Sequence, residues 1–371
     1  MRDDADAFQA EERRAAVFGV IETLFEIGEG AAGKQGSDLA RDGGFQRFFQ
    51  GGADEIGDAF GNLESDVADE AVGMGKDLAE KYPLARQTFQ EADDTLGYKL
   101  SQICFEGPED QLRLTEITQP AILTASVAAL RVLETRMPRP CYVAGHSLGE
   151  YSAHVAAGTM RFADAVRTVR SRGKYMQEAV PVGVGAMAAI LGMDLAAVTA
   201  VCHDAAQDEV CQPANINSSE QIVISGHTAA VERAAKLADE RGAKRAKLLP
   251  VSAPFHCSLM KPAQDRLKVD FDKLTLRDPV YPVACNVEAE FVTDELRARD
   301  TLVRQVTGSV KWEQSMQLLI AKGIQTFIEI GPGKVLCGLM RQIDRSKTAL
   351  NVSDDASLGK TLEALGVKIE G

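Results

Sequence analysis

Hydrophobic positions recur every three or four residues in several segments from residue 72 onward. This spacing predicts helices over 77–92, with an interruption near Pro83, and over 120–137. Short apolar runs at 141–144, 282–286 and 326–330 predict buried strands. Strands that alternate with helices indicate an α/β fold whose mostly parallel sheet is covered on both faces. Further helices are expected at 161–179, 258–274, 294–306, 312–322, 334–345 and 356–366.

The middle of the chain has an order of its own. Strand-like and helical segments follow one another as β-α-β-β-α-β at 185–191, 194–206, 211–217, 221–226, 231–242 and 246–251. This succession is the split-βαβ, ferredoxin-like pattern, and about 65 residues suit one small domain. We therefore expect a ferredoxin-like domain over 185–250, inserted into a larger domain formed by 71–184 and 251–371.

The first 70 residues differ from the rest in composition. They contain none of the 13 prolines, 11 of the 32 glycines, and 6 basic against 17 acidic side chains, so they hold most of the net charge of −13. Either they form a flexible acidic extension, or they are not the natural beginning of the fold. We expect the second. Residues 17–21 could supply a substitute strand, although about 50 residues would be an unusually long connection.

Composition also excludes several classes of protein. A chain with 45% hydrophobic residues is an ordinary globular protein, and its acidic balance argues against nucleic acid or anionic lipid as a partner. Seven cysteines form no CxxC pair, and the odd number favours a reducing compartment over a disulfide framework. No apolar stretch reaches the roughly 20 residues of a membrane helix, and the acidic N-terminus is unlike a signal peptide. We expect a cytoplasmic protein without a metal.

A possible nucleophile stands in the sequence GHSLG at 145–149. It fits G-x-S-x-G, follows the predicted strand and precedes a helix of small residues, which is the context of a nucleophile elbow. In such a turn Ser147 stands at a helix N-terminus, and the N–H of Leu148 can stabilise an oxyanion. An ordinary glycine-rich turn with an N-capping serine is the other interpretation of these five residues.

A nucleophilic serine needs a base, and the chain has five histidines. His146 lies inside the elbow and His154 on the following helix, while His203 and His227 fall in the inserted domain. His256 lies where the chain leaves the inserted domain and rejoins the large one. It can therefore face the serine across the cleft between the domains.

Five motifs resemble, in order and spacing, the bacterial malonyl-CoA:acyl-carrier-protein transacylases, the malonyltransferases of type II fatty acid synthesis. They are GHSLGEY (145–151), RGKYMQEAVPVGVGAMAAI (172–190), NINSSEQIVISG (215–226), PVSAPFHCSLM (250–260) and IEIGPGKVLCGL (328–339). The resemblance runs from about residue 71 to the C-terminus. It implies an α/β-hydrolase-like large domain with an inserted ferredoxin-like domain, in agreement with the pattern above. It also implies a monomer that needs no permanently bound cofactor, with malonyl-CoA as substrate and acyl carrier protein as partner.

The resemblance assigns roles to single residues. Ser147 matches the acylated nucleophile and His256 its general base and acid, while Gln305 matches the residue whose backbone carbonyl orients the histidine. Arg172 matches the arginine that pairs with the malonyl carboxylate, a contact that suits the fork of a guanidinium. Phe255 matches a bulky aromatic that disfavours methylmalonyl groups.

One segment departs from the family pattern. The family's N-terminal Gly-Gln-Gly-Ser-Gln loop, whose first glutamine gives the second oxyanion donor, would fall at about 64–70, which here contains ESDVADE. An acyl-CoA hydrolase and a catalytically impaired, carrier-binding relic are therefore alternatives to the transferase. GPGK at 331–334 lacks the spacing of a phosphate-binding loop and predicts a turn that opens a helix.

Overall fold

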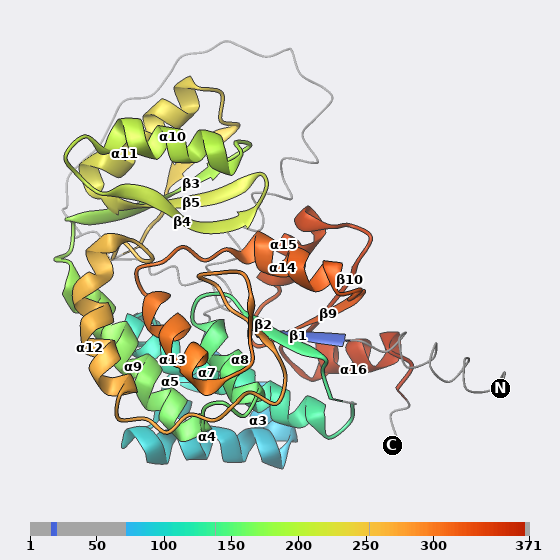
Figure 1. Cartoon of the computed structure of the whole chain (residues 1–371). Helices are drawn as coiled ribbons and strands as arrows, with labels where there is room; N and C mark the ends of the chain where they lie inside the picture. Colours follow the sequence, from blue (N-terminus) through green and yellow to red (C-terminus); the bar gives the residue numbers. More distant parts are fainter. Residues whose placement is uncertain (1–15, 21–71, 138, 252, 368–371) are drawn as a thin grey trace, which may run out of the picture.

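The computed structural model describes residues 16–20, 72–137, 139–251 and 253–367, which form a large and a small lobe (Figure 1). The large lobe is built on a six-stranded sheet in the order β10-β9-β1-β2-β7-β8. Its strands are parallel except β8, which runs antiparallel to β7. They are β1 (Ala16–Val20), β2 (Tyr142–Gly145), β7 (Val283–Ala284), β8 (Phe291–Val292), β9 (Thr326–Ile330) and β10 (Thr348–Val352).

The substitute strand that the sequence allowed at 17–21 is present as β1. Ala16–Val20 lies between β2 and β9, with Val17 opposite Tyr142 and Phe18 opposite Ile328. The long connection to residue 72 therefore does not prevent these five residues from pairing in the middle of the sheet. The physical reason is that β2 and β9 would otherwise each leave a row of unpaired backbone groups in the middle of the sheet. The predicted departure at 64–70 lies outside the described residues.

Helices cover both faces of the large sheet. They are α3 (Lys76–Lys81), α4 (Pro83–Leu96), α5 (Leu100–Glu106), α6 (Glu109–Leu112), α7 (Thr115–Glu134), α8 (Gly149–Ala156), α9 (Phe162–Ala179), the 3₁₀ turn η1 (Ser258–Met260), α12 (Lys261–Phe271), α13 (Glu295–Arg304), α14 (Trp312–Ala321), α15 (Val335–Ile343) and α16 (Asp355–Ala364).

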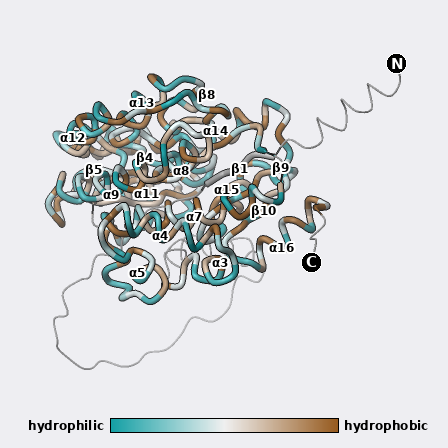
Figure 2. The backbone as a smooth tube through the Cα atoms, turned by 90° about the horizontal axis from the view of Figure 1, so that it is seen from below, coloured by the Kyte–Doolittle hydropathy of each residue, from teal (hydrophilic) through white to brown (hydrophobic). Residues whose placement is uncertain are grey.

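Local chemistry explains where several helices begin and end. Pro83 opens α4 at its first position, after α3 has ended at Lys81, and this break is the predicted interruption near Pro83. The left-handed Gly97 ends α4. Asp294 caps α13 by accepting a hydrogen bond from the N–H of Arg297. Helix α7 begins five residues before the predicted start, with Pro120 inside it, and is almost wholly buried at the centre of the main core. Along outer helices such as α12, hydrophobic and hydrophilic residues alternate (Figure 2).

The small lobe is an antiparallel sheet in the order β4-β5-β3-β6. Two helices cover the face of this sheet that is turned away from the large lobe (Figure 1) and share with it a separate hydrophobic core. The elements are β3 (Gly185–Leu191), α10 (Leu195–Ala206), β4 (Cys211–Ser218), β5 (Gln221–His227), α11 (Thr228–Glu240) and β6 (Arg245–Leu248). This is the predicted β-α-β-β-α-β order.

The two lobes are joined by backbone pairing as well as by the chain. The N–H of Val310 donates to the carbonyl of Ala214 at 2.8 Å, and the N–H of Ile216 donates to the carbonyl of Val310 at 2.8 Å. Strand β4 of the small lobe is thereby tied to the segment that follows α13. Within the described residues, no helix is both long and apolar enough to cross a membrane.

Candidate active site

Ser147 lies in a tight turn between β2 and α8. Its φ of 51° is in the left-handed region, which is costly for a residue with a side chain and is characteristic of functional turns. A Cβ at Gly145 would come within 1.9 Å of the backbone of Gly149, so only glycine fits there. The predicted elbow is therefore present, and the serine side chain stands at the N-terminus of a helix.

His256 contacts this serine directly, and both side chains are buried. Its Nε2 lies 2.7 Å from Ser147 Oγ, while its Nδ1 donates to the carbonyl oxygens of Gln305 at 2.9 Å and Gly308 at 3.2 Å. Two carbonyl acceptors require the proton to sit on Nδ1, which leaves the lone pair of Nε2 facing the serine hydroxyl. The backbone carbonyl of Gln305 thus lies where the resemblance places it, and main-chain oxygens orient the ring.

Burial keeps this imidazole neutral. Desolvation, reinforced by the nearby charge of Arg172, lowers the pKa of His256 from 6.5 to about 3. The neutral form, which is the one that can accept the serine proton, is therefore the form present at physiological pH.

Arg172 on α9 is fully buried and points at the nucleophile. One terminal nitrogen lies 3.1 Å from Ser147 Oγ and 3.0 Å from Gln305 Oε1, and the other lies 2.9 Å from Gln119 Oε1 on α7. These acceptors are a hydroxyl and two neutral amide oxygens. A solvent-facing role is excluded, and a strong cation stands beside the reacting hydroxyl.

The backbone around the serine contains one available oxyanion donor. The N–H of Ser147 is occupied, because it donates to Asn286 Oδ1 at 2.7 Å. The N–H of Leu148, the next at the start of α8, has no hydrogen-bond partner among the described residues. It is therefore placed to receive developing negative charge. The segment expected to hold the second donor is outside the described residues.

Three side chains that converge on the elbow hold its backbone in place. Asn286 Nδ2 donates to the carbonyl of Gly145 at 2.7 Å, and Gln305 Nε2 donates to the carbonyl of Ser147 at 2.7 Å. Glu150 Oε2 accepts from Gln305 Nε2 at 2.7 Å and from the N–H of Asn286 at 3.1 Å. The strained turn is thus held by groups from α8, from the loop after β7 and from the end of α13.

The sequence analysis missed Glu150, Asn286 and Gln119. Asn286 follows the carboxyl end of β7, where open α/β sheets place their ligands, so its position was a usable signal. Glu150 stands within the GHSLGEY motif, to which the sequence analysis assigned no role beyond the nucleophile turn. Burial raises its pKa from 4.5 to about 7, against hydrogen bonds from Gln305 and Asn286 that favour the ionised form.

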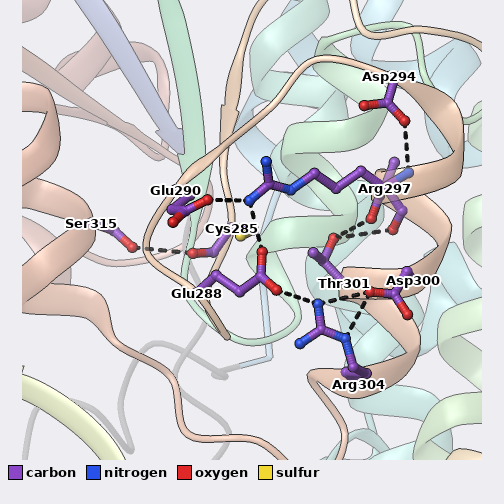
Figure 3. A network of polar contacts seen from close by, with 10 residues as sticks. Cys285, Glu288, Glu290, Asp294, Arg297, Asp300, Thr301, Arg304 and Ser315 are labelled. Atoms are coloured by element: carbon purple, nitrogen blue, oxygen red, sulfur yellow. Dashed lines mark hydrogen bonds and ion pairs between the residues drawn. The ribbon is translucent and has the colours of Figure 1, made fainter.

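An ion-pair cluster outside the site holds two of these residues together. Glu288 binds both Arg297 and Arg304 of α13, and Arg297 also binds Glu290 (Figure 3). Glu288 and Glu290 belong to the loop that carries Asn286, while α13 ends directly before Gln305. The cluster therefore links the two segments that bind the elbow.

The remaining predicted residues lie in other environments. Phe255 is buried in the main core next to His256. His146 Nε2 donates to Asn217 Oδ1 of β4 at 2.9 Å, which joins the elbow to the small lobe. His203 is exposed, and His227 accepts from the N–H of Val210, so neither takes part in the site.

The turn at 331–334 opens α15, as predicted. The carboxylate of Glu329 accepts hydrogen bonds from the N–H groups of Leu336 and Cys337 at the start of this helix. The helix N-terminus is thereby occupied by a side chain of the protein.

The fold and the site together define a serine-type acyl-transfer centre on an α/β scaffold. Residues 70–364 match the family described as acyl transferase domain, and the chain belongs to that family. It is 48% identical over 295 residues to the malonyl CoA-acyl carrier protein transacylase of Escherichia coli (strain K12), covering 79% of this chain and 96% of that one.

Solved structures agree with this assignment. The malonyl CoA-acyl carrier protein transacylase from Coxiella burnetii superposes with a TM-score of 0.81 at 36% identity, covering 95% of this chain and 98% of that chain. A malonyl-transacylase in complex with a type II PKS acyl-carrier protein superposes with a TM-score of 0.80 at 38% identity, covering 94% and 99%.

Proposed function

We propose that this protein transfers the malonyl group from malonyl-CoA to the phosphopantetheine thiol of acyl carrier protein, for fatty acid synthesis. The observation that carries the proposal is the buried guanidinium of Arg172, 3.1 Å from the hydroxyl of Ser147. A cation beside the nucleophile favours an acyl group that ends in a carboxylate. The relatives named above, all malonyl transacylases, support the same substrate.

In the first half-reaction, Ser147 Oγ attacks the thioester carbonyl of malonyl-CoA while its proton moves to His256 Nε2. The carbonyl oxygen becomes an oxyanion near the N–H of Leu148. When the intermediate collapses, the C–S bond breaks, the imidazolium returns the proton to the sulfur, and CoA leaves as a thiol. The product is a malonyl ester of Ser147.

The second half-reaction reverses these steps with another thiol. His256 takes the proton of the phosphopantetheine thiol, the sulfur attacks the ester, and the proton returns to Ser147 Oγ as the C–O bond breaks. The enzyme is restored and malonyl-carrier protein is released. Because the first product leaves before the carrier reacts, the kinetics are of the ping-pong type.

Two residues determine the choice of acyl group in this proposal. Arg172 binds the free carboxylate through paired, charge-assisted hydrogen bonds. Phe255 restricts space near the α-carbon, so methylmalonyl-CoA is disfavoured by about 1–3 kcal/mol for its extra methyl group.

The division into two domains, the cellular location and the oligomeric state also belong to this proposal. The large catalytic domain comprises 71–184 and 251–371, and the small domain comprises 185–250. The separate sheets support this division, because β3 begins at Gly185 and β6 ends at Leu248. We further infer a cytoplasmic monomer, and light scattering of the purified chain tests the oligomeric state.

The test uses malonyl-CoA labelled in the malonyl group. The expected result is a burst of CoA release, label retained on the denatured protein, and discharge of that label onto holo acyl carrier protein. Release of free malonate at the burst rate would instead indicate a hydrolase. Carrier binding without any retained label would indicate a catalytically impaired relic.

A further inference from the structure

Glu150 is a buried acid that the mechanism above does not use. It is the second residue of α8, it is fully buried, and its Oε2 accepts hydrogen bonds from Gln305 Nε2 at 2.7 Å and from the N–H of Asn286 at 3.1 Å. It contacts neither Ser147 Oγ nor His256 directly. An effect on the reaction would therefore pass through the groups that it binds and through its electrostatic interaction with Arg172.

The side-chain amide of Gln305 is the more informative of these groups. Its Nε2 faces three oxygens, those of Glu150, of the Ser147 carbonyl and, at 3.4 Å, of the Asn286 side chain, while its Oε1 accepts from Arg172 at 3.0 Å. Turning this amide by 180° would point its N–H₂ group at the guanidinium and its oxygen at three other oxygens. Four hydrogen bonds would be lost at once in a buried site.

The Glu150 side chain and the Ser147 carbonyl select the same amide orientation, because both accept from Nε2. This selection is stronger when Glu150 is ionised, since hydrogen bonds with one ionised partner are roughly twice as strong as neutral ones. Gln305 also orients His256 through its main-chain carbonyl at 2.9 Å, and this contact does not depend on its side chain. Removing Glu150 therefore leaves this contact to His256 in place, while it frees the amide that accepts from Arg172.

We propose that Glu150 is a positioning residue that holds the Gln305 amide with its oxygen toward Arg172, and thereby aligns the guanidinium for an acyl group that bears a carboxylate. The inference rests on the proposed function. It differs from a purely structural role in one measurable respect: loss of Glu150 should reduce selection of malonyl over acetyl groups, and not only the total rate.

The experiment measures kcat/KM for loading of malonyl and acetyl groups from their CoA esters by the same enzyme preparation. Their ratio is insensitive to the folded fraction, so a partly unfolded variant still gives an answer. Glu150→Met, which keeps the length but lacks an acceptor, should lower the malonyl-to-acetyl ratio about tenfold, the effect of one lost hydrogen bond. Glu150→Gln keeps an acceptor oxygen and should restore the ratio to within about threefold of the parent.

Two further variants test the route through Gln305. Gln305→Met removes the amide but keeps the main-chain carbonyl, and adding Glu150→Met to it should not lower the ratio further. Glu329→Met is the matched control, because Glu329 is also a buried glutamate that binds backbone N–H groups, but it lies on β9 and binds the start of α15. It should leave the ratio unchanged.

The outcomes separate this inference from the proposed function. If Arg172→Met lowers the ratio but Glu150→Met slows both acyl groups equally, the role of Glu150 is overturned and the proposed function stands. Additive effects of Glu150→Met and Gln305→Met would likewise overturn it. If Arg172→Met does not change the ratio, the carboxylate contact is refuted, and the inference about Glu150 with it.

Discussion

Replacement of Arg172 by methionine tests whether the buried guanidinium binds the carboxylate of the acyl group. Methionine keeps an unbranched, buried side chain on α9 but removes the charge and every N–H donor. The guanidinium lies 3.1 Å from Ser147 Oγ and is already aligned by Gln119 at 2.9 Å and Gln305 at 3.0 Å. A carboxylate on the serine-bound acyl group would therefore meet a cation that is held in place before binding.

The expected magnitude follows from the number of contacts. A hydrogen bond to a charged group is worth about 1.5–3 kcal/mol, so two bonds to a carboxylate amount to about 3–6 kcal/mol. At 1.36 kcal/mol per factor of ten, malonyl loading should fall by about 10²- to 10⁴-fold. Acetyl loading should stay the same or rise, because an acetyl group has no carboxylate and gains nothing from the guanidinium of the parent enzyme.

The assay is single-turnover loading, with label retained on the acid-denatured protein, measured for both CoA esters. Arg170→Met is the control, since Arg170 lies on the same helix but stands over the ring of Tyr98, 5.1 Å from its centroid. It should leave both rates near those of the parent. An equal fall for malonyl and acetyl groups in Arg172→Met would show that Arg172 has a structural role and would refute the carboxylate contact.

Four further predictions concern other residues. His256→Ala should lower malonyl loading by several orders of magnitude, and loading at the parental rate would mean that the base is misassigned. Burial raises the pKa of Glu150 to about 7 in the folded protein, against 4.5 in the unfolded chain, so the stability that it contributes at low pH is lost as pH rises through 7. Glu150→Gln should therefore gain about 3 kcal/mol in unfolding free energy relative to the parent between pH 4.5 and 8, measured with urea. Burial lowers the pKa of His154 to about 3, so the parent loses stability as pH falls below 6.5. His154→Leu should gain about 2 kcal/mol in unfolding free energy relative to the parent between pH 7.5 and 5, and a difference in unfolding free energy that does not change with pH would contradict this. Glu288→Gln should lower the melting temperature by a few degrees at low salt and less at 1 M salt, because its ion pairs are partly exposed.

The elements of the fold were largely predictable because their signals are local. The three- and four-residue spacing gave α9 and α13 within two residues at each end, and the predicted strands at 185–191 and 326–330 coincide with β3 and β9. The short edge strands β8 and β10 were not predicted, since two to five residues with mixed burial show no clear period. The central position of β1 also had no local signal, because pairing with β2 and β9 is decided by residues far along the chain.

The sequence by itself made Ser147 a candidate nucleophile, because a strained turn at a helix start needs glycine at fixed spacing around the serine, but it left an ordinary N-capping turn open. The order of the chain favoured His256 among five histidines, and the resemblance, not the residues alone, singled out Arg172 and Gln305. Only the tertiary structure brought Ser147 Oγ within 2.7 Å of His256 Nε2 and placed Glu150 against the amide of Gln305. These contacts join residues 109 and 155 positions apart. Hydrogen bonds over such separations depend on how the lobes and helices pack, and that packing leaves no periodic pattern in the residues concerned.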